Sequence, residues 1–206
     1  MLTQPDGYAP PHGQPSRRST VGCGNGRQSF ALAEHFPRVM GVDLSAEAIR
    51  GAQALYRRDN LEFRIVDILD DDEVAHLHDE LGDANVYVRG VLHQLRTEDL
   101  AAAVRTVATL VGRRGRAFVV ELSPAAEGLF KSLASDPNGP PPKLARVFQH
   151  GIVPVALAPG QVRELFMAEG LAAVFTGASG IVTTQVGPGG QPLEVPCDAW
   201  LFSRSA

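Results

Sequence analysis

The stretch VGCGNG at residues 21–26 constrains this chain more than any other. Its three glycines, Gly22, Gly24 and Gly26, stand at every second position. A β-branched pair precedes them, and the apolar pattern over residues 28–36 predicts a helix directly after them. Glycine at a turn between a strand and a helix permits positive φ and lets a ligand lie against the backbone. The N-terminus of the following helix presents free N–H groups to such a ligand.

Two aspartates add to this pattern. Residues 39–43 form a short apolar run that ends in Asp43, and residues 61–67 form a run that ends in Asp67. Both runs predict strands, and in a parallel α/β sheet the carboxyl ends of the strands line the ligand crevice. We therefore expect the glycine turn and both acids to converge on one site. Asp43 can accept hydrogen bonds from two ribose hydroxyls and Asp67 from an exocyclic amine, which suits an adenosine-bearing cofactor.

The spacing of the glycines distinguishes between such cofactors. The dinucleotide fingerprint is G-x-G-x-x-G, and counted from Gly22 its last glycine would fall at Arg27. The spacing here is G-x-G-x-G, and the chain contains no Tyr-x-x-x-Lys sequence. A nicotinamide-dependent oxidoreductase is therefore disfavoured.

Three stretches resemble the class I S-adenosylmethionine-dependent methyltransferases: VGCGNG at residues 21–26, GVDLS at 41–45 and VDIL at 66–69. The resemblance extends over residues 20–203 and is strongest up to Leu122. One position departs from the family pattern, because Thr20 stands where the family usually has an acidic residue. With the polar residues before it, Thr20 predicts either a first strand that is short and exposed or weaker cofactor binding.

The resemblance implies a set of cofactor-binding residues: Gly22, Cys23, Gly24, Gly26, Asp43, Leu44, Asp67, Ile68, Arg89 and Gly90. The glycine turn would lie along the methionyl part of S-adenosylmethionine, and residues 89–90 below its sulfonium. Asp43 would bind the ribose. Asp67, through its side chain, and Ile68, through its backbone N–H, would hold the adenine, and Leu44 would pack on it.

Two further residues stand close to predicted strand ends. His93 follows the strand predicted at residues 86–91, and histidine titrates near neutrality, so His93 is a candidate catalytic base or substrate contact. The alternative is a histidine that packs and caps locally. Glu121 ends the strand predicted at residues 116–121 and points toward the same crevice. We expect it to anchor the cofactor or substrate, or only to satisfy a neighbouring turn.

Strands and helices alternate as far as Leu122, which predicts an α/β fold. The expected architecture is Rossmann-like and doubly wound, with a mostly parallel seven-stranded sheet. Two strands without a helix between them, at residues 171–184 and 197–202, indicate an antiparallel C-terminal strand. Ser45 and Thr97 are expected N-caps. Helices are expected over residues 28–36, 45–57, 70–81, 97–110, 126–133, 143–149 and 161–168.

The domain boundaries follow from proline and glycine. Residues 1–18 are rich in both and lack periodicity, which predicts an irregular tail before one methyltransferase domain at residues 19–206. Residues 123–159 interrupt the strand–helix rhythm and include the sequence PNGPPP. A connection of this length is usually functional or disordered, and we interpret it as a substrate-covering insertion.

Composition narrows the cellular setting and the partners. The chain has 206 residues, of which 44% are hydrophobic and 20% charged, as expected for one globular domain. Its net charge of −4 argues against a nucleic-acid partner. Cys23 and Cys197 are far apart and form no disulfide framework, which fits a reducing compartment. Because no apolar run has the length of a membrane span and no signal peptide is visible, we expect a cytoplasmic protein.

Missing motifs narrow the reaction further. No Asn/Asp-Pro-Pro-aromatic run follows the fourth strand, and Pro196-Cys197 falls at the last strand, so enzymes that methylate nucleic-acid bases are disfavoured. No acidic cluster follows the fourth strand, so no metal is expected. The sequence therefore predicts an S-adenosylmethionine-dependent methyltransferase, monomeric or homodimeric, that acts on O or N of a small molecule. The alternative is a binding or scaffold protein on this fold with weak or no catalysis, suggested by Thr20.

Overall fold

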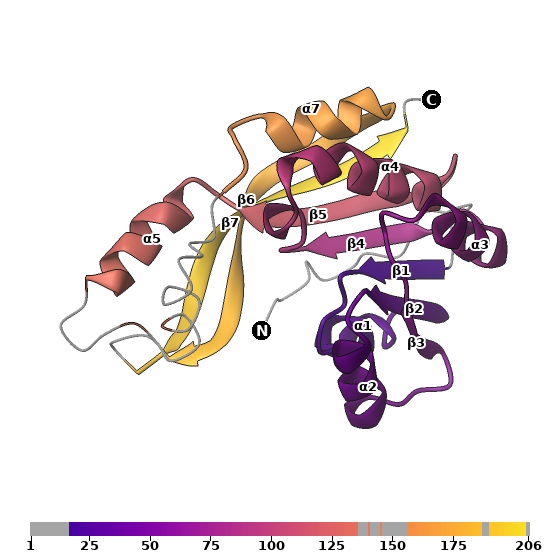
Figure 1. The fold of residues 1–206 in the computed structure, drawn as a ribbon, viewed down its shortest axis with the longest axis horizontal. Helices are drawn as coiled ribbons and strands as arrows, with labels where there is room; N and C mark the ends of the chain where they lie inside the picture. Colours follow the sequence, from indigo (N-terminus) through magenta and orange to yellow (C-terminus); the bar gives the residue numbers. More distant parts are fainter. Residues whose placement is uncertain (1–16, 136–139, 141–144, 146–155, 187–189, 205–206) are drawn as a thin grey trace.

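A computed structural model describes residues 17–135, 140, 145, 156–186 and 190–204. In this part of the chain one sheet of seven strands has the order β3-β2-β1-β4-β5-β7-β6 (Figure 1). The strands are β1 (Arg17–Val21), β2 (Arg38–Asp43), β3 (Leu61–Ile65), β4 (Asn85–Arg89), β5 (Arg116–Leu122), β6 (Leu171–Val186) and β7 (Pro192–Arg204). Strands β1 to β5 are parallel, whereas β7 pairs antiparallel with both β5 and β6. The predicted α/β fold with a mixed sheet is confirmed.

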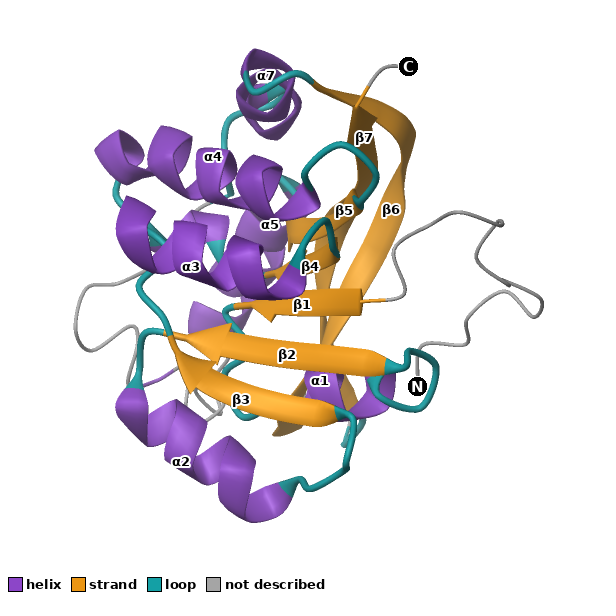
Figure 2. Ribbon diagram, turned by 90° about the vertical axis from the view of Figure 1, so that its right-hand side faces the viewer, coloured by secondary structure: helices purple, strands orange, loops and turns teal. Residues whose placement is uncertain are grey.

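Helices cover both faces of this sheet. They are α1 (Arg27–Leu32), α2 (Ala46–Leu55), α3 (Asp71–Leu81), α4 (Leu100–Val111), α5 (Ala125–Ala134) and α7 (Gln161–Ala168), with short 3-10 turns η1 (Leu92–Gln94) and η2 (Thr97–Asp99). Helices α3, α4 and α7 lie side by side along one face, as Figure 2 shows. Helices α1, α2 and α5 pack against residues of the other face.

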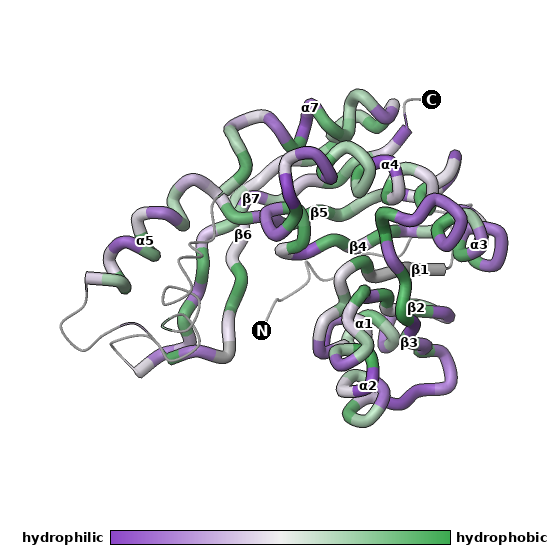
Figure 3. Tube along the Cα trace, viewed as in Figure 1, coloured by the Kyte–Doolittle hydropathy of each residue, from purple (hydrophilic) through white to green (hydrophobic). Residues whose placement is uncertain are grey.

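The larger core lies between the sheet and helices α3, α4 and α7. Alternate residues of β4 and β5 point into it, so that Val86 and Val88 are buried there and Tyr87 faces the opposite side. Phe166 of α7 stacks on Phe202 of β7 with ring centroids 4.1 Å apart, and both are fully buried. Figure 3 shows the resulting contrast between apolar central strands and the polar connection from α2 to β3. Burial of alternating apolar side chains is what holds these layers together.

The first strand is short but not at an edge. It has five residues and pairs with β2 on one side and with β4 on the other. Its start at Arg17 lies inside the segment expected to be an irregular tail, and residues 1–16 lie outside the described part. Sheet pairing on both sides therefore overrides the polar sequence of this strand.

The first helix is shorter than predicted. It ends at Leu32 rather than near residue 36. The residues after it form i→i−3 turns, with His35 N–H donating to the Leu32 carbonyl at 3.0 Å. The side-chain amide of Asn60 then donates to the carbonyls of Ala33 and Phe36, each at 2.8 Å, and so satisfies groups that a longer helix would have bonded.

The helices α2 and α3 start where the sequence indicates, and α4 does not. Ser45 caps α2 by accepting from Ala48 N–H at 3.2 Å, and Asp70 caps α3 by accepting from the N–H groups of Asp72 and Glu73. The prediction for Thr97 is wrong. It begins the short turn η2, and α4 starts at Leu100 without a side-chain cap.

The expected insertion at residues 123–159 is only partly described. Its first helix is present as α5, whereas the helix expected at residues 143–149 lies, apart from residue 145, outside the described residues. Strands β6 and β7 form a long antiparallel hairpin that continues past the end of β5 and lies beside α5 (Figure 1). Among the described residues, no helix has the length and apolarity needed to cross a membrane.

Candidate active site

The carboxyl ends of β1 to β4 meet at one edge of the sheet, and the predicted site residues gather there. Because these strands are parallel neighbours, their carboxyl ends place the glycine turn, Asp43, Asp67 and Gly90 on the same side. The backbone confirms the close spacing, since Cys23 N–H donates to the Val42 carbonyl at 2.9 Å.

The glycine turn needs glycine for two different reasons. Gly22 and Gly24 have φ values of 64° and 51°, a region that side chains disfavour. A Cβ on Gly22 would stand 2.4 Å from Val91 Cγ2, so Gly22 allows the loop after β4 to approach the turn. A Cβ on Gly24 would meet nothing within 4 Å. The backbone at Gly24 therefore faces open space, as a ligand-binding turn requires.

Cys23 contributes its backbone rather than its thiol. Its side chain is buried, and this burial, together with the charge of Asp43, raises the pKa of the thiol to about 12. The thiolate is the reactive form of cysteine. Cys23 is therefore a poor nucleophile.

Asp43 ties the glycine turn to the start of α2. One carboxylate oxygen accepts from Gly24 N–H at 2.8 Å, and the other accepts from Ser45 N–H at 2.9 Å. An ionised carboxylate has about four acceptor positions, so Asp43 retains capacity for further donors. The next side chain, Leu44, is 65% exposed.

Asp67 and Ile68 follow β3. The Asp67 carboxylate accepts from Leu69 N–H at 2.9 Å, and Asp67 N–H donates to Glu73 at 2.8 Å. Thr106 donates its hydroxyl to the Ile68 carbonyl at 2.6 Å. Within the described residues the N–H of Ile68 has no hydrogen-bond partner. This strand end thus presents an acceptor and a free donor side by side.

The end of β4 is built around a second glycine. Gly90 has a φ of 64°, and its N–H donates to the Val120 carbonyl at 2.8 Å. A Cβ on Gly90 would lie 3.4 Å from His93 Cε1 and 3.5 Å from Ile181 Cδ1. Its neighbour Arg89 forms no ion pair with any described residue.

The Glu121 carboxylate is bonded to the turn that follows β4. It is completely buried, and its carboxylate accepts from the N–H groups of Val91 and Leu92 at 2.8 and 2.7 Å. It also accepts from His93 N–H at 3.4 Å and contacts His93 Nδ1 at 2.7 Å. Glu121 thereby satisfies the turn after β4, and its oxygens are occupied by these groups of the chain.

His93 is held by Glu121 and by the turn that contains it. Its side chain is 13% exposed, so the imidazole is mostly enclosed. In the described structure no hydrogen bond is made by Nε2, the second ring nitrogen. His93 and Glu121, distant in sequence, therefore form a dyad next to Gly90.

Sequence reasoning missed three residues of this site. Val91 packs on Gly22, Ser45 donates its N–H to Asp43, and Ile181 lies over Gly90. Ser45 is predictable as the residue after a strand-end acid that begins a helix. Ile181 is not, because only the path of β6 brings it to the end of β4.

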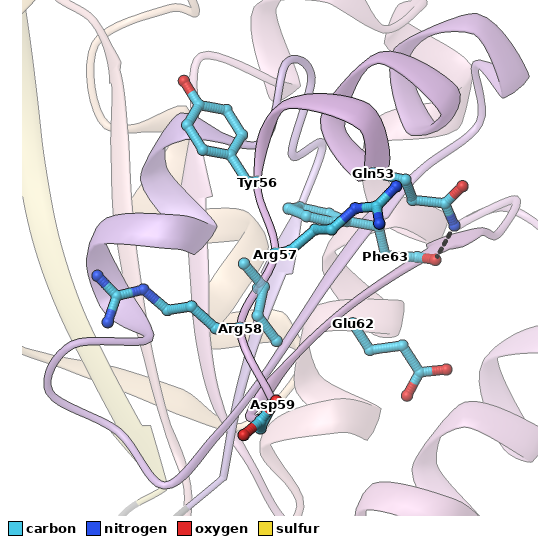
Figure 4. A pocket seen from close by; sticks show the side chains of 8 residues that line it. Gln53, Tyr56, Arg57, Arg58, Asp59, Glu62 and Phe63 are labelled. Carbon is cyan, nitrogen blue, oxygen red and sulfur yellow. Dashed lines mark hydrogen bonds between the residues drawn. The ribbon is translucent and has the colours of Figure 1, made fainter.

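A separate hollow of about 430 Å³ lies near the amino end of β3 and is shown in Figure 4. Gln53 donates to the Phe63 carbonyl there at 3.0 Å. Arg58 lies in this hollow but is paired with Glu34 at 2.6 Å. Since β3 begins at Leu61, this hollow is at the opposite end of the strand from Asp67 and is not part of the site.

Comparison with known proteins shows what this chain is similar to. Residues 20–115 match the methyltransferase domain family. No curated protein matches the sequence. A crystal structure of an S-adenosylmethionine-dependent methyltransferase from Anabaena variabilis is 27% identical, with a TM-score of 0.84 over 92% of this chain and 77% of that chain.

More distant structures share the fold. A Methanosarcina mazei S-adenosylmethionine-dependent methyltransferase is 14% identical, with a TM-score of 0.62 over 91% of this chain and 92% of that one. The magnesium protoporphyrin IX methyltransferase of Synechocystis, with bound S-adenosylhomocysteine, is 19% identical, with a TM-score of 0.58 over 91% of this chain and 73% of that one. Residues 20–115 thus carry a methyltransferase domain, the chain is similar to S-adenosylmethionine-dependent methyltransferases over most of its length, and S-adenosylmethionine is its cofactor.

Proposed function

We propose that this protein transfers the methyl group of S-adenosylmethionine to an oxygen or nitrogen atom of a small molecule at the carboxyl edge of β1 to β4. The observation that carries the proposal is the convergence of the glycine turn, Asp43 and the His93–Glu121 dyad at this edge. The first two suit an adenosine cofactor, and the third supplies a basic nitrogen beside the end of β4.

The residues at this edge fit the cofactor group by group. The open backbone at Gly24, between Gly22, Cys23 and Gly26, suits the methionyl part. Asp43 has acceptor capacity for the ribose hydroxyls, and the exposed Leu44 offers an apolar surface to the adenine. The carboxylate of Asp67 and the unpaired N–H of Ile68 suit the amine and a ring nitrogen of the adenine.

Residues 89–90 complete the cofactor site in this proposal. Gly90 leaves room at the end of β4 because it has no side chain. Arg89 has no ion-pair partner among the described residues, so its charge is available to a carboxylate of the ligand. The sulfonium and the methyl group that it carries would then lie above residues 89–90, as the resemblance implies.

The cofactor supplies a methyl group that its sulfonium makes electrophilic. The chain must hold the acceptor in line with that group and keep water away. His93 is in place to take a proton from the acceptor. Residues 123–159 are the proposed cover over the acceptor, supported by the packing of Phe130 in α5 near Ile181 on the hairpin.

We propose that the protein is cytoplasmic. We also propose that it is a monomer or homodimer and has no nucleic-acid partner. Two buried free thiols, Cys23 and Cys197, support a reducing compartment. The net charge of −4 supports a small-molecule substrate over a polyanion.

Titration with S-adenosylhomocysteine tests the proposed site. In Asp43→Asn an amide N–H₂ must face the N–H of Gly24 or of Ser45, and one charged acceptor for the ribose is lost. We expect Kd to rise by roughly 10- to 150-fold, the equivalent of one hydrogen bond to a charged group. Asp59→Asn, on the exposed connection between α2 and β3, is the matched control and should bind normally. A folded wild-type protein without binding, or unchanged binding by Asp43→Asn, would contradict the proposal.

A further inference from the structure

We infer that Glu121 is a positioning residue that fixes the tautomer of His93, so that His93 Nε2 is the atom that takes the proton of the methyl acceptor. This inference rests on the proposed methyl transfer and narrows its substrate class. The acceptor is a nucleophile that still carries its proton, a hydroxyl or an amine with an N–H. An acceptor that is already ionised, or that has no proton to lose, would not need this arrangement.

The first step is the hydrogen bonding of the Glu121 carboxylate. One oxygen accepts from the N–H groups of Val91 and Leu92 at 2.8 and 2.7 Å. The other lies 2.7 Å from His93 Nδ1 and 3.4 Å from His93 N–H. Three backbone N–H groups can only donate, and an ionised carboxylate can only accept. The proton between Glu121 and the ring therefore belongs to Nδ1.

The second step is the consequence for the other ring nitrogen. A neutral imidazole carries one proton, so a proton on Nδ1 leaves Nε2 with a free lone pair. Nε2 has no hydrogen-bond partner in the described part of the chain, although the side chain is only 13% exposed. Its lone pair is therefore available to a bound molecule.

The third step is the location of that nitrogen. The ring carbon Cε1, which is bonded to both nitrogens, lies 3.4 Å from the Cβ position of Gly90. Ile181 Cδ1 is 3.5 Å from the same position, so an apolar side chain also lies beside Gly90. The free nitrogen is thus beside the end of β4, where the proposed function places the transferred methyl group.

The proton and electron balance is simple. A lone pair of the acceptor forms the bond to the methyl carbon, and the electron pair of the broken carbon–sulfur bond stays on sulfur. The acceptor proton moves to His93 Nε2, which turns the ring into an imidazolium. Its positive charge then faces the Glu121 carboxylate through Nδ1–H. Opposite charges at this distance stabilise the product state, and the proton leaves later to water.

The substitution Glu121→Gln tests this inference directly, because glutamine has nearly the same size and shape as glutamate. The amide oxygen can keep the bonds to Val91 and Leu92, which leaves the amide N–H₂ facing His93 Nδ1. Nδ1 must then become the acceptor, and the ring proton moves to Nε2. Long-range ¹H–¹⁵N spectra of the histidine rings should show the Nδ1–H tautomer in the wild type and the Nε2–H tautomer in Glu121→Gln. His93→Gln assigns the signals, and Glu127→Gln on the exposed face of α5 is the control.

Acylation by diethyl pyrocarbonate gives a second readout that a purely structural Glu121 would not change. The reagent needs a free ring lone pair, so His93 should react roughly tenfold or more slowly in Glu121→Gln, the tautomer preference that one charge-assisted hydrogen bond provides. Mass spectrometry at His93 is normalised to His35, which is exposed and outside the site.

Each outcome decides the inference. An Nε2–H tautomer in the wild type overturns it, and this holds even if Glu121→Gln fails to fold. Unchanged tautomer and reactivity in a folded Glu121→Gln also overturn it. Titration with S-adenosylhomocysteine on the same samples reports separately on the proposed function, since neither His93 nor Glu121 is among the proposed cofactor contacts. Failure of that titration with the expected tautomers would remove the methyl transfer but keep the dyad.

Discussion

Replacing Gly24 by alanine separates ligand binding from folding at the glycine turn. Among the described residues, no atom lies within 4 Å of the position of the added Cβ, so the methyl group creates no clash there. Alanine at a φ of 51° is strained by about 1–2 kcal/mol. For a domain of this size each kcal/mol lowers Tm by about 2–4 °C, so Tm should fall by roughly 2–8 °C.

The same methyl group should have a larger effect on binding. It occupies the open space over the turn, where the methionyl part of the cofactor is proposed to lie. We expect the Kd for S-adenosylhomocysteine, measured by isothermal titration, to rise at least about tenfold, equivalent to about 1.4 kcal/mol.

Two other glycines provide the comparison. Gly22→Ala places its Cβ 2.4 Å from Val91 Cγ2, so overpacking of about 1–3 kcal/mol adds to the strain and stability should fall further than in Gly24→Ala. Gly51→Ala, on an exposed position of α2, should stabilise the protein by about 0.5–1 kcal/mol and leave binding unchanged. Wild-type affinity in a folded Gly24→Ala protein would refute the reasoning, because no ligand could then lie against this backbone.

Three further predictions concern the core, a thiol and an ion pair. Phe166→Ala removes a fully buried ring from its stack on Phe202, and chemical denaturation should show a loss of about 3–5 kcal/mol. Cys23, with its thiol pKa raised to about 12, should react with iodoacetamide at pH 8 at least about 100-fold more slowly in the folded than in the urea-unfolded protein. Burial raises the pKa of Asp83, but hydrogen bonds, above all from Arg114, outweigh it and hold the pKa below its ordinary value. The folded-state pKa is thus the lower one, so the stabilising contribution is complete above the unfolded value of about 3.9 and is lost as pH falls below it. The stability difference between wild type and Asp83→Asn in urea unfolding should therefore shrink below about pH 4, and a difference that grows in acid would contradict the assignment.

Local patterns in the sequence predicted the elements that depend on neighbours in the chain. The glycine turn, the cap at Ser45 and the strand end at Asp43 follow from the residues beside them. The strand expected to run to Asp67 ends at Ile65, and Asp70, expected as the first residue of a helix, is the cap of that helix. Thr97 shows the limit of this reasoning. It is a residue type that often caps helices, but it begins the 3-10 turn η2, and the helix α4 starts only three residues later. The early end of α1 depends on Asn60, which is more than twenty residues away and gives no local signal.

The dyad illustrates why the active site was harder to predict than the fold. His93 and Glu121 were each candidates, but their contact depends on the pairing of β4 with β5. The assignment of the Glu121 carboxylate to three backbone donors also depends on the turn geometry after β4. Sequence supplied the chemical groups, and sheet register decided which groups meet.

The hairpin of β6 and β7 has two halves whose sequences can change at different rates during evolution. Its inner half pairs with β5 as far as Cys197 and contains core residues such as Leu171. Its outer half, including Ile181, continues beyond Leu122 and packs with α5. In the proposed function this outer half borders the acceptor, so substitutions and length changes there would alter the surface offered to the acceptor without changing the residues at the ends of β1 to β3. One continuous pair of strands would then let acceptor preference diverge during evolution while the proposed cofactor site stays constant.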